Sequence, residues 1–154
     1  REGIPVQVAA NPAVSGFTSE DAIRHELPKL PDRADLATLL IGANDVVRGV
    51  PPERFRSNLR VMVQDLQQRV PPGRLMLLTI PDFSKAPAML GEDVSGRIWE
   101  FNQIIWEEAT GPVVDLFPIQ LPDSSYADGL HPNAQGYEAW EREIFDVVLP
   151  SVRG

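Results

Sequence analysis

The chain has 154 residues, with 43% hydrophobic and 23% charged, which is the size and balance of one soluble globular domain spanning residues 1–154. Its 14 basic and 22 acidic residues give a net charge of −8, which makes nucleic acid or an anionic membrane an electrostatically poor partner. The absence of cysteine excludes disulfides, thiol catalysis and zinc–thiolate sites. No apolar run approaches the ~20 residues that span a bilayer. The cellular compartment stays open.

Four short apolar runs predict buried strands, at residues 6–10, 36–41, 75–80 and 113–116. The second and third are almost continuously apolar, as expected for strands of a parallel sheet that is covered on both faces.

Helical spacing of apolar residues predicts helices over 53–70 and 94–109 and a last helix that starts near Pro132 or Asn133. A shorter helix over 22–27 follows the capping signal of residues 18–21. The aromatic residues of the 94–109 helix, Trp99, Phe101 and Trp106, are expected to pack in the interior. Strands that alternate with helices predict an α/β fold with a parallel sheet, whose ligands gather at the carboxyl ends of the strands.

Three polar or glycine-containing segments fall where that rule places a site. Gly16 follows the first predicted strand, Gly42-Ala43-Asn44-Asp45 follows the second, and Asp128-Gly129-Leu130-His131 precedes the last helix. His131 is a natural general base, and Asp128, three residues earlier, can accept its second ring proton. The Asn44 amide and the Gly16 N–H are the kinds of donor that stabilise an oxyanion.

Each segment taken alone has a simpler interpretation. Glycine, asparagine and aspartate are common in turns for local hydrogen-bonding reasons. Asp128 and His131 could also be two metal ligands, although no third and fourth ligand are evident nearby. The other histidine, His25, lies in a polar stretch and is expected at the surface.

Together, in this order and spacing, the three segments resemble three of the four sequence blocks of the GDSL/SGNH hydrolases. The resemblance implies a flavodoxin-like three-layer α/β/α fold, and an esterase or lysophospholipase-like acylhydrolase that acts on small-molecule esters through an acyl-enzyme without a cofactor. It implies His131 as general base, Asp128 as its orienting acid, and Gly16 and Asn44 as the oxyanion hole. The loop after the third predicted strand often shapes substrate binding in this family, which points to Phe83.

The remaining block of that family, which is its first and reads Gly-Asp-Ser followed by an apolar residue, occurs nowhere in the 154 residues. The resemblance places it at the end of a first strand upstream of Arg1, so the nucleophilic serine is expected there and this chain alone is expected to be inactive. In a sheet of order 2-1-3-4-5 that strand would lie between residues 6–10 and 36–41, and the missing N-terminal strand segment is therefore an expected partner. Two alternatives stay open: a non-catalytic binding module on the same fold, and a carbohydrate acetyl esterase or acyltransferase.

Overall fold

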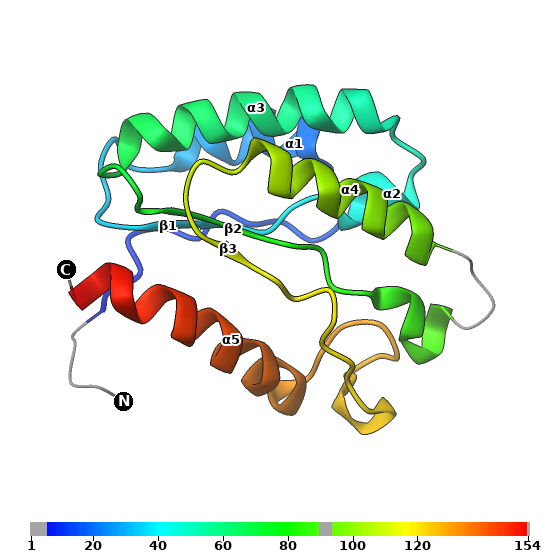
Figure 1. Cartoon of the computed structure of the whole chain (residues 1–154). Coiled ribbons are helices and arrows are strands. Elements are labelled where there is room, and N and C mark those ends of the chain that lie inside the picture. The colour runs from blue at the N-terminus through cyan, green and yellow to red at the C-terminus, as the bar shows by residue number, and fades with distance from the viewer. Residues whose placement is uncertain (1–5, 90–93, 154) are drawn as a thin grey trace.

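The computed structural model describes residues 6–89 and 94–153, which form a parallel sheet between two layers of helices (Figure 1). The strands are β1 (Ala37–Leu39), β2 (Leu75–Leu78) and β3 (Val113–Val114). The α-helices are α1 (Ser19–His25), α2 (Ala43–Val47), α3 (Pro52–Arg69), α4 (Ser95–Glu108) and α5 (Ala134–Arg153). Short 3₁₀ turns occur at η1 (Leu27–Lys29), η2 (Phe83–Lys85), η3 (Pro87–Met89) and η4 (Asp123–Ser125).

The strand order is β1-β2-β3, and both pairings are parallel. Thr38 lies opposite Met76 in the first pair, and Leu77 lies opposite Val113 in the second. All four residues of β2 are buried, as expected for a central strand covered on both faces. Because every strand runs the same way, the three carboxyl ends meet at one edge of the sheet. The predicted α/β class and three of the predicted strands are confirmed.

The larger core lies between the sheet and α1, α3 and α4, which cover one face (Figure 1). The apolar positions that α3 repeats at helical spacing are all buried there: Phe55, Leu59, Met62, Val63 and Leu66. Phe55 stacks on Phe101 of α4, with ring centroids 4.6 Å apart. The predicted helices over 53–70 and 94–109 are therefore confirmed within one residue at each end.

A smaller core lies on the opposite face, under α5. Its buried residues are Leu78, Val114 and Leu116, and Trp140 and Ile144 of α5 pack against them. The start of α5 agrees with Asn133 as its N-cap, since the Asn133 side-chain oxygen accepts hydrogen bonds from the backbone of residues 135 and 136. None of the helices within the described residues is long and apolar enough to cross a bilayer.

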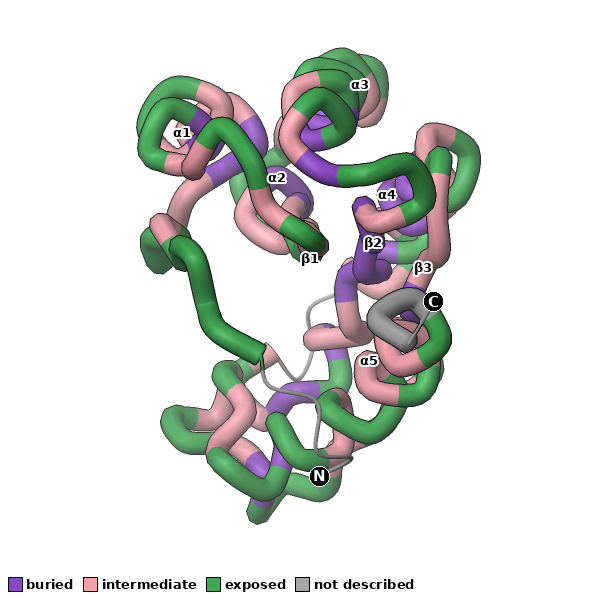
Figure 2. The backbone as a smooth tube through the Cα atoms, turned by 90° about the vertical axis from the view of Figure 1, so that its left-hand side faces the viewer, coloured by how far each residue is buried: buried purple, intermediate pink, exposed green. Residues whose placement is uncertain are grey.

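The prediction of a strand at residues 6–10 is wrong. The segment makes no sheet pairing and is exposed, with Val6 at 79% and Val8 at 76% of full exposure. Figure 2 shows it set apart from β1, which is an edge strand within the described part of the chain. An extended apolar segment forms a strand only where a neighbour accepts its backbone hydrogen bonds, and no described strand lies beside this one.

Two further expectations differ from the structure. Phe101 is fully buried, but Trp99 and Trp106 are 56% and 46% exposed, because they lie on the outer face of α4. Residues 42–45, for which a strand-ending turn was the simpler interpretation, lead into the short helix α2. The α1 helix does have its predicted capped start, with Thr18 and Asp21 forming a capping box, but it begins at Ser19, three residues before the expected position.

Candidate active site

The turn from Asp128 to His131 brings an imidazole and a carboxylate into direct contact. The Asp128 Oδ2 atom lies 2.8 Å from His131 Nδ1. The other carboxylate oxygen accepts the backbone N–H groups of His131 at 2.7 Å and Leu130 at 3.0 Å. Because an ionised carboxylate only accepts, Nδ1 carries the proton, and Nε2 of a neutral His131 is left with a free lone pair. This is the arrangement that a general base requires.

The same hydrogen bonds set the charge of Asp128. The backbone N–H of His131, the His131 ring and the backbone N–H of Leu130, in that order, hold the pKa of the Asp128 carboxyl far below its ordinary value. Both side chains are largely exposed, at 61% for His131 and 58% for Asp128. The carboxylate therefore stays ionised at any pH at which a histidine could work as a base.

Backbone contacts close this turn at its base. The backbone N–H of Ala127 donates to the carbonyl of His131 at 2.8 Å, and residues 126 and 132 form an isolated bridge across the base of the turn. Gly129 has a φ of +84°, a conformation that other residues adopt only with strain. The first turn of α5 packs so tightly beneath it that a Cβ on Gly136 would lie 2.7 Å from the Ser125 carbonyl oxygen.

The second pair of expected site residues, Gly16 and Asn44, is also brought together. Asn44 lies in the first turn of α2, and its Nδ2 donates to the carbonyl of Phe17 at 3.0 Å. Arg48, one turn later, donates to the carbonyl of Gly16 at 2.7 Å. An amide nitrogen has two hydrogens, so one N–H of Asn44 fixes the side chain and the second stays available to a ligand.

Gly42 controls how the chain enters α2. The sequence interpretation assigned no such role to this residue. Its φ is +113°, and a Cβ there would lie 2.8 Å from Ile80 and 2.9 Å from Phe55. Only glycine fits both the backbone conformation and the space. The signal was visible in the sequence as a glycine directly after a strand, but its neighbours come from β2 and α3 and could not be seen there.

Phe83, the expected substrate-binding residue, begins η2 after β2 and is half-buried against the larger core. The neighbouring Asp82 accepts hydrogen bonds from Ser84 and from the Ser95 hydroxyl at the start of α4, which fixes this loop. A role for Phe83 in substrate binding stays a prediction.

Both pairs lie at the end of the sheet where the carboxyl ends of the strands meet. Figure 1 shows α2 and the loop before α5 at this end. Among the described residues, no hydrogen bond joins the Asp128–His131 pair to the Gly16–Asn44 pair. The described part of the chain also contains no group of three or more histidine, aspartate or glutamate side chains that could hold a metal ion.

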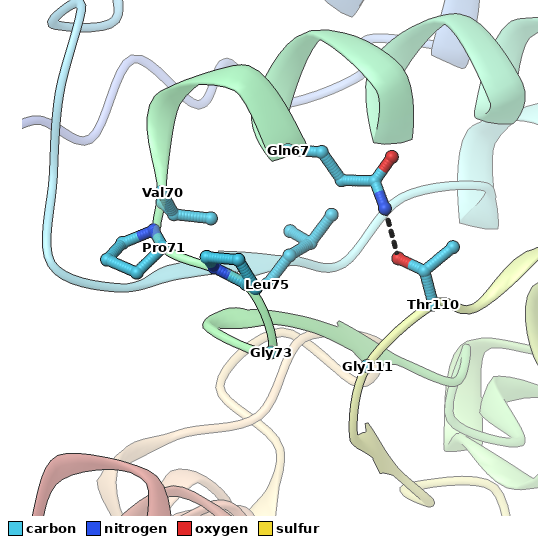
Figure 3. A pocket seen from close by; sticks show the side chains of 8 residues that line it. Gln67, Val70, Pro71, Gly73, Leu75, Thr110 and Gly111 are labelled. Carbon is cyan, nitrogen blue, oxygen red and sulfur yellow. Dashed lines mark hydrogen bonds between the residues drawn. The ribbon is translucent and has the colours of Figure 1, made fainter. Parts of the chain in front are cut away.

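A cavity of about 230 Å³ lies at the other end of the strands (Figure 3). Its walls include Pro72 and Gly73, just before β2, and Thr110 and Gly111, just before β3. Gln67 reaches across it to donate a hydrogen bond to Thr110. Because these residues precede the strands, this cavity is separate from the candidate active site.

The sequence pattern that defines the GDSL-like Lipase/Acylhydrolase family matches residues 1–139. The chain belongs to this family. It is 28% identical over 137 residues to an arylesterase of Vibrio mimicus, covering 87% of this chain and 66% of that protein. It is 31% identical over 111 residues to a multidomain esterase of Ruminococcus flavefaciens, covering 68% of this chain and 14% of that protein. This GDSL-family chain thus spans less than two thirds of the length of either relative.

Solved structures agree with the family assignment. A lipase/acylhydrolase from Enterococcus faecalis is 27% identical, with a TM-score of 0.63 over 90% of this chain and 72% of that one. An SGNH-hydrolase family esterase is 29% identical, with a TM-score of 0.53 over 90% of this chain and 73% of that one. A psychrotrophic esterase from Pseudoalteromonas, at 23% identity and a TM-score of 0.63 over 91% of this chain and 75% of that one, shares the fold. The chain has the SGNH-hydrolase fold expected from its sequence blocks.

Proposed function

We propose that this protein is a serine ester hydrolase that works through an acyl-enzyme, with its nucleophilic serine on a segment upstream of Arg1. The observation that carries the proposal is the 2.8 Å contact between His131 Nδ1 and Asp128, which leaves Nε2 as a free proton acceptor at the carboxyl-end edge of the sheet. Ester hydrolysis needs such a base together with a nucleophile and oxyanion donors.

In the first half of the reaction, His131 Nε2 takes the proton of the serine hydroxyl while the serine oxygen attacks the ester carbonyl. The second N–H of Asn44 and the backbone N–H of Gly16 stabilise the oxyanion that forms. His131 then gives its proton to the departing alcohol, and the acyl group stays on the serine. Asp128 stays ionised throughout and stabilises the imidazolium.

In the second half, His131 Nε2 takes a proton from water, whose oxygen attacks the acyl carbonyl. When the tetrahedral intermediate collapses, the proton returns to the serine oxygen and the carboxylic acid leaves. No step uses a cofactor. Phe83 contacts the acyl or alcohol group from the loop after β2.

The free edge of β1 supports the proposed position of the serine segment. β1 pairs only with β2 among the described strands, and Leu40, just after β1, is 43% exposed. The apolar residues 6–10 lie exposed on the far side of that edge (Figure 2). A strand inserted there in parallel would pair with β1 and cover these apolar side chains, and its carboxyl end would lie beside α2.

The first test is the coding sequence upstream of Arg1, where a Gly-Asp-Ser block is expected. The full-length protein is then assayed with p-nitrophenyl acetate, and His131→Ala is compared with His25→Ala, the matched change at the other histidine. We expect His131→Ala to lower turnover by about 10⁴–10⁶-fold and His25→Ala to leave it unchanged. Turnover retained by His131→Ala would refute the assigned base.

The chain starting at Arg1 gives a second comparison. Loss of the nucleophile in subtilisin costs about 2 × 10⁶ in turnover, so this chain alone should be close to inert. Absence of Gly-Asp-Ser upstream, with no turnover by the full-length protein, would instead favour a binding module on the same fold. Comparing p-nitrophenyl esters of increasing chain length with acetylated sugars separates a general esterase from a carbohydrate acetyl esterase.

A further inference from the structure

Asp45 is a buried carboxylate for which the proposed reaction has no use. It lies in the first turn of α2, directly after Asn44, and its exposure is 0%. Both of its oxygens accept hydrogen bonds from one residue of another helix. The Ser19 hydroxyl donates to Oδ1 at 2.5 Å, and the Ser19 backbone N–H donates to Oδ2 at 2.8 Å. A buried charge with this pairing is costly to disturb.

A third helix completes this buried cluster. Ser19 also has 0% exposure, and its Oγ accepts a 2.9 Å hydrogen bond from Nδ2 of Asn58 on α3, which is 8% exposed. The Ser19 N–H is one of the first-turn donors of α1 that has no partner within its own helix. Asp45 therefore satisfies an N-terminal donor of α1 and, through Ser19, links the starts of α1 and α2 to α3.

The two proposed oxyanion donors lie close to this cluster along the chain. Asn44 precedes Asp45, and Gly16 lies three residues before Ser19. The Asn44 amide bonds the carbonyl of Phe17, between Gly16 and Ser19 in the chain. Three hydrogen bonds thus join residues 44–45 to residues 17–19, and two of the three end on Asp45. The two bonds that Asp45 accepts from Ser19 therefore lie within three residues, along the chain, of both proposed donors.

We propose that Asp45 is a positioning residue that sets the geometry of the oxyanion hole by holding α1 against α2 through Ser19. The inference rests on the proposed function, because it assigns a purpose to that geometry. An oxyanion hole works only when its donors are already aimed at the developing charge, and removing one donor costs about 10²–10³ in turnover. A shift of the start of α1 that separates the two donors lowers turnover for the same reason.

The test is Asp45→Asn in the full-length protein. The new side chain has the same shape but keeps one acceptor oxygen for the two Ser19 donors. We expect kcat with p-nitrophenyl acetate to fall by about 10–10²-fold, with a KM change below about threefold. In an Asn44→Ala background the same change should have an effect below about threefold, because the donor that it positions is already gone.

A matched control separates positioning from loss of stability. Thr79→Val removes another fully buried hydroxyl, one that bonds Asp115 and the backbone N–H groups of Leu116 and Phe117 just beyond the ends of β2 and β3. This variant should lower the melting temperature as Asp45→Asn does while keeping kcat within about twofold. If Asp45→Asn keeps the wild-type kcat, or lowers kcat equally with and without Asn44, the inference is overturned. Where Asp45→Asn does not fold, Ser19→Ala, which retains the backbone bond, is expected to give the same pattern with a smaller loss.

A readout that does not depend on turnover separates this inference from the proposed function. The side-chain amide protons of Asn44, followed by NMR, should shift and exchange faster in Asp45→Asn and stay unchanged in Thr79→Val. Unchanged Asn44 signals in Asp45→Asn would overturn the positioning role, whatever the activity. Altered Asn44 signals in a protein whose wild type hydrolyses no ester would support the linkage and refute the proposed function alone.

Discussion

The backbone N–H of Ala88 donates a 2.9 Å hydrogen bond to the carbonyl of Gly129. This bond joins η3, in the loop after β2, to the centre of the turn that carries Asp128 and His131. The loop itself is fixed at Asp82, which accepts from the hydroxyl of Ser95 on α4. The position of the proposed base therefore depends on a segment some 40 residues earlier in the chain, in addition to its own local hydrogen bonds.

Gly129→Ala is expected to lower turnover further than its loss of stability alone would cause. The φ of Gly129 is +84°, so alanine there costs about 1–2 kcal/mol and strains the turn that orients His131. Displacement of a catalytic group by about 1 Å costs about 10²-fold in rate. Melting curves and p-nitrophenyl acetate kinetics of the full-length protein measure the two effects separately.

Gly73→Ala is the control for that variant. Its φ is +76°, and nothing lies within 4 Å of the added Cβ, so the conformational cost is similar, but Gly73 lies at the opposite end of β2. It should lose a comparable amount of stability and keep the wild-type kcat. Equal kcat values for the two variants would contradict the dependence of His131 on the turn.

Asp128 is expected to titrate well below the ordinary aspartate value of 3.8, because the hydrogen bonds from residues 130 and 131 favour its charged form. Its folded-state pKa is lowered, so its contribution to stability is present above the unfolded-state value and is lost as the pH falls through the folded value. Carbon-13 NMR of the aspartate carboxyls, titrated down from pH 7, checks this. A midpoint near 3.8 for Asp128 would show that the bonds do not persist in solution.

Asp128→Asn is expected to lower turnover by up to about 10⁴-fold, the loss seen when the equivalent aspartate of a serine protease is changed in this way. An asparagine side chain can present an N–H to His131 Nδ1 and so select the wrong tautomer. Asp123→Asn changes an exposed carboxylate of the preceding η4 turn and should leave turnover unchanged. A similar kcat for the two variants would exclude an orienting role for Asp128.

Gly42→Ala is expected to destabilise the fold by about 1–3 kcal/mol, because the added Cβ meets Ile80 and Phe55 at a φ of +113°. Gly96→Ala provides the opposite case. Gly96 lies in α4 with nothing within 4 Å of an added Cβ, so alanine should be neutral or stabilising by up to about 1 kcal/mol. Urea unfolding followed by circular dichroism compares the two. A Gly42→Ala protein as stable as Gly96→Ala would contradict the close packing around α2.

Glu108 links α4 to α3 through Arg60 and Arg56, and its side chain is only 13% exposed. Hydrogen bonds from Arg60, and then Arg56, lower the pKa of Glu108 below its ordinary value, so its stabilising contribution is present at neutral pH and is lost on acidification below about pH 4. Glu108→Gln should therefore lower the free energy of unfolding by about 1 kcal/mol at pH 7 and by less at pH 3.

Glu107→Gln is the matched change one residue earlier. Within the described residues Glu107 pairs with one cation, Arg56, and it is 59% exposed, so the loss of stability in Glu107→Gln should be smaller at pH 7. Urea unfolding of the two variants and the wild type at both pH values gives the comparison. A Glu108→Gln deficit that is as large at pH 3 as at pH 7 would show that the charge is not its cause.

The sequence by itself determined the features that depend on residues close along the chain. The apolar spacing of α3, the capping box at Thr18 and the N-cap at Asn133 specify helices through contacts within one or two turns. The same holds for Asp128 and His131, whose hydrogen bonds span three residues. The order of the glycine, asparagine and histidine segments also indicated the family correctly.

Only the tertiary structure decided what depends on neighbours far along the chain. The strand expected at residues 6–10 did not form, because no described strand lies beside it to accept its backbone hydrogen bonds. The apolar sequence alone gives no information about such a partner. Gly42 is required by Ile80 and Phe55, and Asp45 is buried because Ser19 and Asn58 come from two other helices. Local hydrogen bonds can be inferred from spacing, whereas burial and long-range pairing arise only when separate segments pack together.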